Sequence, residues 1–375
     1  MKRWIKTAIW CVVSFHSALM DAPRAGEFQV RSADGVEIRG EANNAKPALP
    51  AVIFVPGTGL FDRDANFGET GTPRDLIFKD LAQRMEARGL ATVRYEPRGV
   101  RYGTAPDQRL DPQLLAKRTT RAMADDLAAV YAWTRSPEGL GARCIAFFAH
   151  SEGMLHVARM AAYKAPPPAL VIGMGAGMQS PAQIIRWQMT ERDATSLDMM
   201  DADRNGITTN DEVPANWQHT PTGANRMLEP LLHPQGAWTA KDVAEVRAIQ
   251  SAAYEKVKAE TLSHADSEPY PNAETVFASY EWWKSWFIDE RPAAELLHLW
   301  NSPVSLHYGD KDSQAMAALQ IAAASSYLDA AKLKTHIHSN RGHTLGEDVL
   351  FGPIDEAIAE TIANEAASIA PSCRQ

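Results

Sequence analysis

One serine stands where a strand-like run of residues gives way to a helix-like run, in the sequence FFAHSEGML. Ser151 has small residues, Ala149 and Gly153, two positions before and two positions after it. This spacing is typical of a nucleophile elbow, a sharp turn that exposes the serine hydroxyl and brings the strand and helix backbones close together. Serine and glycine are common in ordinary turns, so the strand-to-helix context carries most of the prediction that Ser151 is a nucleophile.

A serine hydroxyl reacts well only when a base removes its proton and an acid orients that base. Downstream, PVSLHYGDKD places Asp312 in a turn after a strand-like run, and IHSNRGHTLG places His343 in the loop after the next such run. The order serine, acid, histidine fits an elbow of this kind. Asp310 is the competing acid, and turn capping is the alternative role of the aspartate that is not used.

Three other histidines receive structural interpretations. His150 precedes the serine directly, and in an elbow it is expected to point away from the nucleophile. His336 and His338 lie two residues apart in the last strand-like run, so they share one face and are expected to pack or to meet solvent.

Negative charge develops on the substrate oxygen during acyl transfer, so backbone N–H groups must be placed to stabilise it. Glu152, the residue after the nucleophile, supplies one such group. The second is expected from the loop VPGTGLFDRD, where two glycines allow close backbone approach and Thr58 is the first choice of donor. The alternative is a turn that only joins a strand to a helix. A phosphate-binding loop is disfavoured, because no Lys-Ser or Lys-Thr pair follows the glycines.

The elements that must position these residues alternate between strands and helices. Short runs that are apolar on both faces are typical of strands in a parallel sheet that helices cover on both sides. Such runs cover 51–55, 90–95, 144–149, 169–175, 303–308 and 333–339. Stretches with apolar residues at helical spacing separate them, and Asp34-Gly35 between two alternating runs predicts an antiparallel hairpin at the start. The sequence therefore predicts an α/β protein.

This alternation stops over residues 181–294, where polar helical stretches, loops and the aromatic cluster SYEWWKSWF take its place. We interpret this segment as an inserted cap. The aromatic run has helical spacing and is expected in the core of the cap, with some rings as candidates to line an apolar acyl site.

Several sequence blocks occur in a fixed order: VPGTGLFDRD, GLATVRYEPRGVRYG, FFAHSEGML, SWFIDERPAAELL with PVSLHYGDKDSQ, and NRGHTLGED. Together they resemble secreted bacterial α/β-hydrolases of the serine aminopeptidase-like esterase group. The resemblance implies an α/β-hydrolase fold, with a mostly parallel central sheet, helices on both faces and an inserted, mainly helical cap. It assigns the acid to Asp312, which closes the G-x-x-D turn, and the base to His343. It assigns the oxyanion donors to the Thr58 region and Glu152.

The chain departs from this group at two places. Ala149 stands where glycine is usual, and Glu96-Pro97 stands where the group typically has aspartate and a polar residue before Arg98-Gly99. We expect the second departure to be structural.

The first 25 residues are expected to be a signal peptide, because a basic start, MKRWIK, precedes an apolar stretch of 14 residues, Thr7 to Met20. That stretch is short for a membrane-spanning helix and is interrupted by Ser14, His16 and Ser17, so no stable membrane span is expected after processing. An uncleaved membrane anchor is the alternative. The predicted division is then signal peptide 1–25, hydrolase core 26–180, cap 181–294 and hydrolase core 295–375. A secreted or periplasmic location follows. Loss of Cys11 with the signal leaves Cys144 and Cys373, either as a disulfide or as one buried and one exposed thiol.

The cap contains the sequence DADRNGITTNDE, which matches an EF-hand calcium loop at every defined position. Calcium prefers oxygen ligands, and this loop offers side-chain oxygens, one backbone carbonyl and a bidentate glutamate. The predicted ligands of loop 201–212 are Asp201, Asp203, Asn205, Ile207 through its carbonyl, and Glu212. No second loop is evident to pair with it, and a solvated acidic turn is the alternative. A bound Ca²⁺ is expected to stabilise the cap rather than to take part in chemistry.

Composition limits the classes of partner. Lys plus Arg number 38 and Asp plus Glu number 46, which gives a formal net charge of -8 without a long basic run, so a nucleic-acid partner is not expected.

The predicted function is a serine hydrolase that cleaves carboxylic esters with small or medium acyl groups through an acyl-enzyme, without an organic cofactor. The alternatives are a serine peptidase or amidase with the same triad, and a calcium-dependent binding protein on an inactive hydrolase scaffold. Oligomeric state is not indicated.

Overall fold

The computed structural model describes residues 26–44, 49–67, 70–103, 109–214, 231–268, 270, 279–370 and 373. The predicted signal peptide, residues 1–25, lies outside the described residues. Among the helices described, none is both long enough and apolar enough to cross a membrane.

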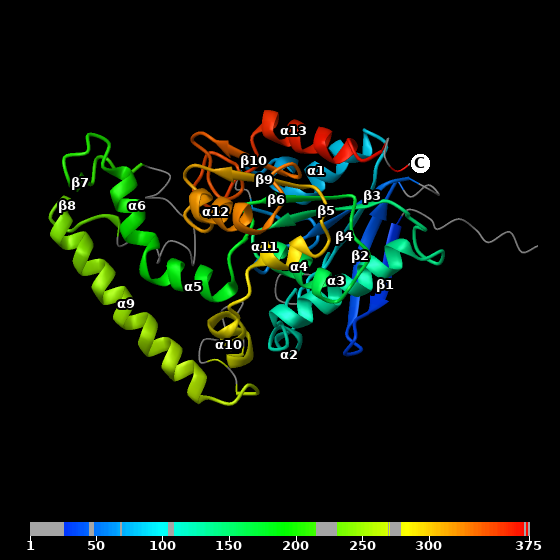
Figure 1. Ribbon diagram of the computed structural model, residues 1–375, viewed down its shortest axis with the longest axis horizontal. Helices are drawn as coiled ribbons and strands as arrows, with labels where there is room; N and C mark the ends of the chain where they lie inside the picture. Colours follow the sequence, from blue (N-terminus) through cyan, green and yellow to red (C-terminus); the bar gives the residue numbers. More distant parts are fainter. Residues whose placement is uncertain are drawn as a thin grey trace, which may run out of the picture.

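An eight-stranded sheet forms the centre of the molecule (Figure 1). In spatial order its strands are β1 (Gly26–Arg31), β2 (Glu37–Asn43), β4 (Ala91–Tyr95), β3 (Ala51–Val55), β5 (Ile145–His150), β6 (Leu170–Met174), β9 (Val304–Gly309) and β10 (Leu333–His338). β2 is antiparallel to both of its neighbours, and the pairs from β4 to β10 are parallel. The predicted hairpin at Asp34-Gly35 and the mostly parallel sheet are confirmed.

Helices cover both faces of the sheet, as expected from strands that are apolar on both sides. One face packs against α1 (Ile77–Glu86) and α13 (Glu356–Ala367), and the apolar layer there includes Phe54, Phe148 and Ile172. The other face packs against α3 (Thr120–Arg135), α4 (Gly153–Ala162), α11 (Ala293–His298) and α12 (Ala317–Tyr327). Short helical turns, η1 (Pro73–Asp75) and α2 (Pro112–Leu115), lie in the connections. The strand ends therefore stand on a rigid, two-sided core.

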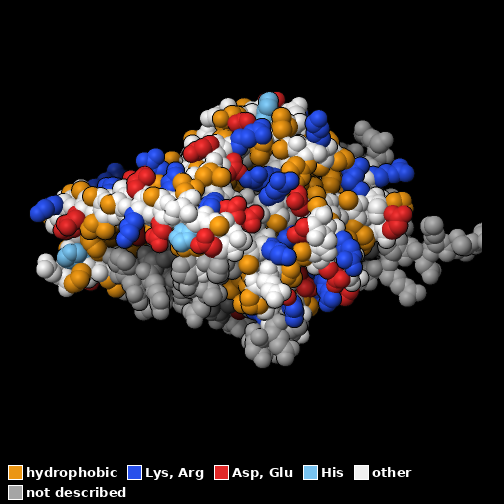
Figure 2. All heavy atoms as spheres, turned by 90° about the horizontal axis from the view of Figure 1, so that it is seen from below, with side chains coloured by type: hydrophobic (Ala, Val, Ile, Leu, Met, Phe, Trp, Pro, Cys, Tyr) orange, Lys and Arg blue, Asp and Glu red, His pale blue; other side chains and the backbone are white. Residues whose placement is uncertain are grey.

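The segment between β6 and β9 leaves the sheet and returns to it. Its elements are α5 (Pro181–Thr190), α6 (Arg192–Met200), β7 (Ile207–Thr209), β8 (Ala237–Thr239), α9 (Ala240–Ser263) and α10 (Tyr280–Ile288). Figure 1 shows α6, β7, β8 and the long α9 extending to one side of the core, with α5 and α10 nearer to it. On the face in Figure 2, basic and acidic side chains are interspersed over this projecting part.

A disulfide joins Cys144, directly before β5, to Cys373, beyond α13. The two Cα atoms are 5.6 Å apart and the residues are 229 positions apart in the chain. This decides between the two cysteine alternatives that the sequence leaves open. A link that closes so long a loop restricts the unfolded chain strongly.

Candidate active site

Ser151 lies at the sharp turn between β5 and α4. Its φ is +52°, a left-handed conformation that a residue with a side chain seldom adopts. The backbone N–H of Ser151 donates to the carbonyl of Met174 on β6 at 3.0 Å, which fixes the turn against the sheet. A Cβ on Gly153 would lie 2.5 Å from the carbonyl oxygen of Val55, so the residue two positions after the serine must be glycine. This is the geometry of a nucleophile elbow.

The residue two positions before the serine tolerates a methyl group. Ala149 is fully buried and lies on β5 between Val55 of β3 and Gly173 of β6 in the register of the sheet. The core therefore has room for a methyl group at this position.

Asp312 and His343 meet in a buried contact. Nδ1 of His343 lies 2.9 Å from Oδ2 and 3.0 Å from Oδ1 of Asp312. The backbone N–H groups of Gln314 and Ala315 donate to Oδ1 of Asp312 at 2.8 and 2.9 Å, so the carboxylate is held in one orientation. Asp310 is exposed and lies outside this contact. Of the two aspartates weighed from the sequence, the structure places Asp312 against the histidine.

The three residues follow the carboxyl ends of parallel strands at one edge of the sheet. Ser151 follows β5, Asp312 follows β9 and His343 follows β10. Ligand sites of open α/β sheets lie at this edge. Close packing holds the histidine in place, because a Cβ on Gly175, in the loop after β6, would lie 2.7 Å from Nδ1 of His343.

His150, which was expected to point away from Ser151, packs against the candidate base. Its ring centroid lies 4.8 Å from that of His343 and 4.9 Å from that of Phe67. Both ring nitrogens are buried and make no hydrogen bond to any described residue. Burial holds the pKa of His150 well below its ordinary value, and the electrostatic effect of the His343 ring acts in the same direction. A neutral ring therefore packs against the candidate base, and the sequence carries no pattern that announces this contact.

The loop after β3 lies against the elbow, as the oxyanion prediction requires. A Cβ on Gly57 would lie 2.8 Å from Cβ of Ser151. Within the described part of the chain, the backbone N–H groups of Thr58 and Glu152 donate no hydrogen bond. Two N–H groups in the predicted donor residues thus remain available to an oxyanion.

The side chain of Glu152 is a feature that the sequence did not reveal. Its carboxylate accepts a hydrogen bond from the hydroxyl of Thr58 and lies 3.8 Å from Nε2 of His156. Burial raises the pKa of this carboxyl, while Thr58, Arg118 and two indoles of α10, Trp282 and Trp286, act in the opposite direction. The contact between Thr58 and Glu152 joins the two predicted oxyanion residues. Two indoles of α10 lie near the carboxylate of Glu152.

The predicted calcium residues also come together. The ligand oxygens of Asp201, Asp203 and Glu212 lie within 4.8 Å of one another. Asp201 accepts backbone N–H groups from Asn205 at 3.1 Å and Gly206 at 2.8 Å, so the loop folds around its acidic side chains. The side-chain atoms of this cluster that could bind a metal ion are all oxygens, which Ca²⁺ prefers as ligands.

A second, degenerate loop pairs with the first, contrary to the sequence expectation. β7 pairs with β8 in antiparallel register, with Thr208 opposite Trp238. Gly236 and Asp242 repeat the spacing of Gly206 and Glu212, and both glycines have positive φ, +93° and +82°. The positions equivalent to Asp201, Asp203 and Asn205 are Leu231, His233 and Gln235, so the second loop lacks the two aspartate carboxylates. The shared glycine-to-acid spacing is the pattern that could have revealed it.

This paired unit packs against the loop that carries His343. Leu197 of α6 and Val213, which follows Glu212, share one apolar cluster with Val349 and Leu350. The backbone N–H of His343 donates to the carbonyl of Val349 at 2.8 Å. The cap therefore supports the candidate base from outside the sheet.

No protein-family model and no curated protein matches the chain. Among solved structures, the chain is similar to the α/β hydrolase GrgF from Penicillium sp. sh18, at 16% identity, with 93% of this chain and 98% of that chain covered and a TM-score of 0.51. It is also similar to the esterase RhEst1 from Rhodococcus sp. ECU1013, at 17% identity, 92% and 99% coverage and a TM-score of 0.48. A proline iminopeptidase from Mycobacterium smegmatis is similar at 15% identity, 92% and 99% coverage and a TM-score of 0.48. At such identities the likeness concerns the fold, and the predicted α/β-hydrolase fold is confirmed.

Proposed function

On this α/β-hydrolase fold, we propose that the protein is a serine hydrolase that cleaves carboxylic esters of small or medium acyl groups through an acyl-enzyme. One observation carries the proposal: a buried Asp312–His343 pair and a strained Ser151 elbow stand at the same edge of the sheet. Core packing does not require a serine in a strained turn at the same edge of the sheet as a buried aspartate–histidine pair. Acyl transfer requires a nucleophile, a base and an acid, and these three residues can supply them.

The proposed reaction has two halves. Oγ of Ser151 attacks the ester carbonyl while Nε2 of His343 takes the hydroxyl proton, and Asp312 stabilises the resulting imidazolium through Nδ1. The N–H groups of Glu152 and Thr58 stabilise the oxyanion. The C–O bond to the alcohol breaks, and His343 returns its proton to the leaving alkoxide. Water then attacks the acyl-enzyme with His343 again as base, which releases the acid and restores Ser151.

A fluorophosphonate tests this proposal, because such reagents label only serines that a base activates. We expect one adduct per folded molecule, located by tandem mass spectrometry on the peptide that contains Ser151, and none on heat-denatured protein. An unlabelled folded protein, or an adduct on another residue, would contradict the proposal. An unlabelled protein with a calcium-dependent partner would instead favour the binding-protein alternative.

Ester and amide preference is tested separately with matched substrates. Aryl esters of two- to eight-carbon acids are compared with aminoacyl aryl amides at equal concentration. We expect the kcat/KM values for esters to exceed those for amides by at least about 10²-fold, or roughly 3 kcal/mol of transition-state free energy. The reverse order would make the protein a peptidase or amidase with the same triad.

We further propose that loop 201–212 binds Ca²⁺ through oxygens of Asp201, Asp203, Asn205, Ile207 and Glu212. The oxygen cluster supports this proposal, and the apolar cluster that includes Val213 and Val349 connects the loop to the His343 loop. Bound Ca²⁺ would supply a positive charge that holds the acidic side chains together. No catalytic step depends on it.

Chelation of Ca²⁺ is expected to lower the melting temperature of the wild-type protein. At a Ca²⁺ concentration about 100 times its dissociation constant, binding stabilises the folded state by roughly 2.7 kcal/mol. Glu212→Gln should remove this calcium-dependent stabilisation, since it removes a bidentate ligand. Asp242→Asn, at the equivalent position of the degenerate loop, is the matched control and should retain it. Melting curves that are equal with and without Ca²⁺ would reject the site.

Export from the cytoplasm is proposed as well. The Cys144–Cys373 disulfide supports it, because disulfides persist mainly in oxidising compartments. N-terminal sequencing of protein recovered from the periplasm or the medium tests it, and a start near residues 21–26 is expected. Recovery only from the cytoplasm, with Met1 retained, would contradict export.

A further inference from the structure

A group of histidines and one glutamate meets between β9, β10 and α13, apart from the residues of the proposed triad. His307 on β9 pairs in parallel register with His336 on β10, so both side chains lie on the same face of the sheet. Their ring centroids are 4.5 Å apart and their planes differ by 11°. Glu365, on α13, reaches both rings. His336 therefore stacks on His307 and is partly exposed, in line with the expectation that it packs or meets solvent, and it also lies beside a carboxylate.

The distances in this group match those between ligands of one metal ion. Nε2 of His307 lies 3.0 Å from Oε2 of Glu365, and Nε2 of His336 lies 3.2 Å from Oε1. One nitrogen from each histidine and one carboxylate oxygen all lie within 4.8 Å of one another. Tetrahedral Zn²⁺ with bonds near 2.0 to 2.1 Å separates its ligand atoms by about 3.3 Å.

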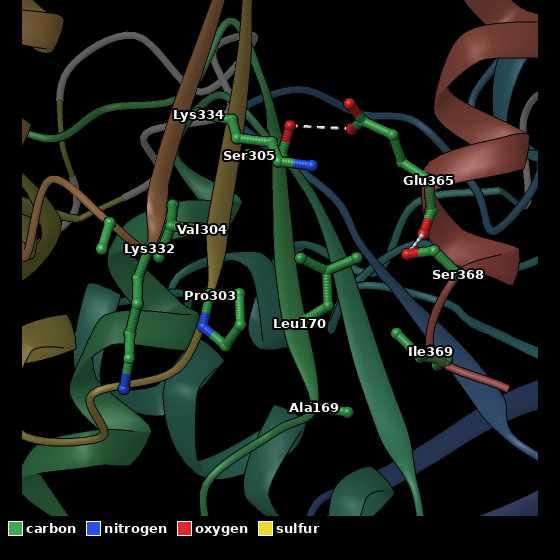
Figure 3. Close-up of a pocket in the computed structure, with 11 residues that line it drawn as sticks. Ala169, Leu170, Pro303, Val304, Ser305, Lys332, Lys334, Glu365, Ser368 and Ile369 are labelled. Carbon is green, nitrogen blue, oxygen red and sulfur yellow. Dashed lines mark hydrogen bonds between the residues drawn. The ribbon is translucent and has the colours of Figure 1, made fainter. Parts of the chain in front are cut away.

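Neighbouring side chains hold the potential ligands in place. Nδ1 of His307 lies 3.1 Å from Nε2 of His338, so a Nδ1–H donated to His338 would leave the lone pair of Nε2 of His307 pointing to Glu365. The hydroxyl of Ser305 donates to Oε2 of Glu365 at 2.7 Å (Figure 3). Metal-binding histidines and carboxylates commonly have such outer partners, which fix the tautomer and the orientation of the ligand.

One nitrogen of the group has no hydrogen-bond partner among the described residues. Nε2 of His336 is buried, and although Oε1 of Glu365 is near, their relative direction gives no hydrogen bond. A buried, unpartnered nitrogen costs free energy unless another group satisfies it. A metal ion between the ligands would satisfy it.

We infer that His307, His336 and Glu365 form a binding site for a divalent transition-metal ion of the Zn²⁺ type. Two imidazoles and one carboxylate suit Zn²⁺, Co²⁺ or Ni²⁺, whereas Ca²⁺ and Mg²⁺ prefer ligand sets made of oxygen. The two rings stack almost parallel, so binding should tilt them toward a common point. The ion would join edge strand β10 to β9 and α13, and stabilise the part of the sheet that precedes Asp312 and His343.

A pocket borders this group at Glu365. This pocket has a volume of about 330 Å³, and its lining includes Ser305, Lys334 and Glu365. In Figure 3, Glu365 extends from α13 toward Ser305, at one end of the pocket. Three protein ligands leave one tetrahedral position for water, and the side chain of His336, which is 34% exposed, lets an ion reach the group from solvent.

The test is titration calorimetry of chelator-treated full-length protein with Zn²⁺ alone, with excess Ca²⁺ present throughout to fill loop 201–212. We expect one equivalent of Zn²⁺ to bind the wild type and to raise its melting temperature. His336→Ala and Glu365→Gln should each weaken binding by more than about 100-fold. His338→Ala should weaken it by about 10- to 100-fold, because His338 only orients a ligand.

His298→Ala is the matched control, because His298 is exposed on α11, which packs on the opposite face of the sheet from α13. It should bind Zn²⁺ as the wild type does. Circular dichroism verifies that each variant is folded, and the absorption spectrum of bound Co²⁺ reports tetrahedral geometry independently. No saturable binding to the wild type, or equal binding in His336→Ala and Glu365→Gln, would overturn the inference. Neither readout depends on hydrolase activity, so failure of the proposed function leaves this test intact.

Discussion

Replacement of Ser151 by alanine is expected to lower kcat for the best ester substrate by about 10⁴- to 10⁶-fold. In the proposed mechanism the variant loses the atom that forms the acyl-enzyme, so the remaining rate would depend on binding and on the oxyanion donors. KM should change little, because the hydroxyl contributes mainly to the transition state. Steady-state kinetics with a chromogenic ester measure both constants.

The fold of the Ser151→Ala variant should be intact. Alanine has the same Cβ as serine and meets the same strain at a φ of +52°, so the elbow is expected to keep its conformation. Ser326→Ala, on the exposed side of α12, is a matched control that should retain full activity. Undiminished turnover in Ser151→Ala, with the control also active, would show that another residue is the nucleophile.

The strands of the sheet could be predicted because a short run of neighbouring residues is enough to identify each one. Runs such as AVIFV and CIAFFA are apolar at every position, which only a strand covered on both faces allows. The observed β3 and β5 correspond to these runs, and both strands are fully buried. The elbow could be predicted for the same reason, since Ala149, Ser151 and Gly153 occupy one turn.

Contacts between distant segments could not be predicted in this way. The carboxylate of Glu152 meets the hydroxyl of Thr58, 94 residues away, and His307 meets Glu365, 58 residues away. Neither pair has a spacing rule, because helices and insertions of variable length separate the partners. The choice between Asp310 and Asp312 needed the G-x-x-D motif of the resemblance, because both residues follow β9 and their local sequence alone does not show which carboxylate reaches His343.

The degenerate loop was missed for a different reason. Pattern matching requires the acidic ligands, and the second loop retains only its glycine and its last acid, Gly236 and Asp242. Its β8 strand is nevertheless needed, because β7 pairs with it. Pairing with a loop that lacks ligands keeps the structural role of a second loop, while only loop 201–212 of the pair has the ligands for Ca²⁺.

Asp312→Asn is expected to reduce kcat by about 10⁴-fold, although the substitution preserves the shape of the side chain. The backbone N–H groups of Gln314 and Ala315 hold Oδ1, so the carbonyl oxygen of asparagine should take that position. The amide NH₂ then replaces Oδ2 and donates to Nδ1 of His343, which places the ring proton on Nε2. A ring protonated at Nε2 cannot accept the proton of Ser151.

Asp310→Asn is the matched control for this experiment, since Asp310 precedes Asp312 by two residues and is exposed. Its kcat should stay within about twofold of the wild-type value, because surface substitutions away from a network have small effects. Fluorophosphonate labelling of Asp312→Asn should slow by a similar factor to kcat, as both reactions need the same base. A large loss in Asp310→Asn with normal activity in Asp312→Asn would reassign the acid. Equal, small effects in both variants would mean that His343 works without a carboxylate, which the buried contact between Asp312 and His343 argues against.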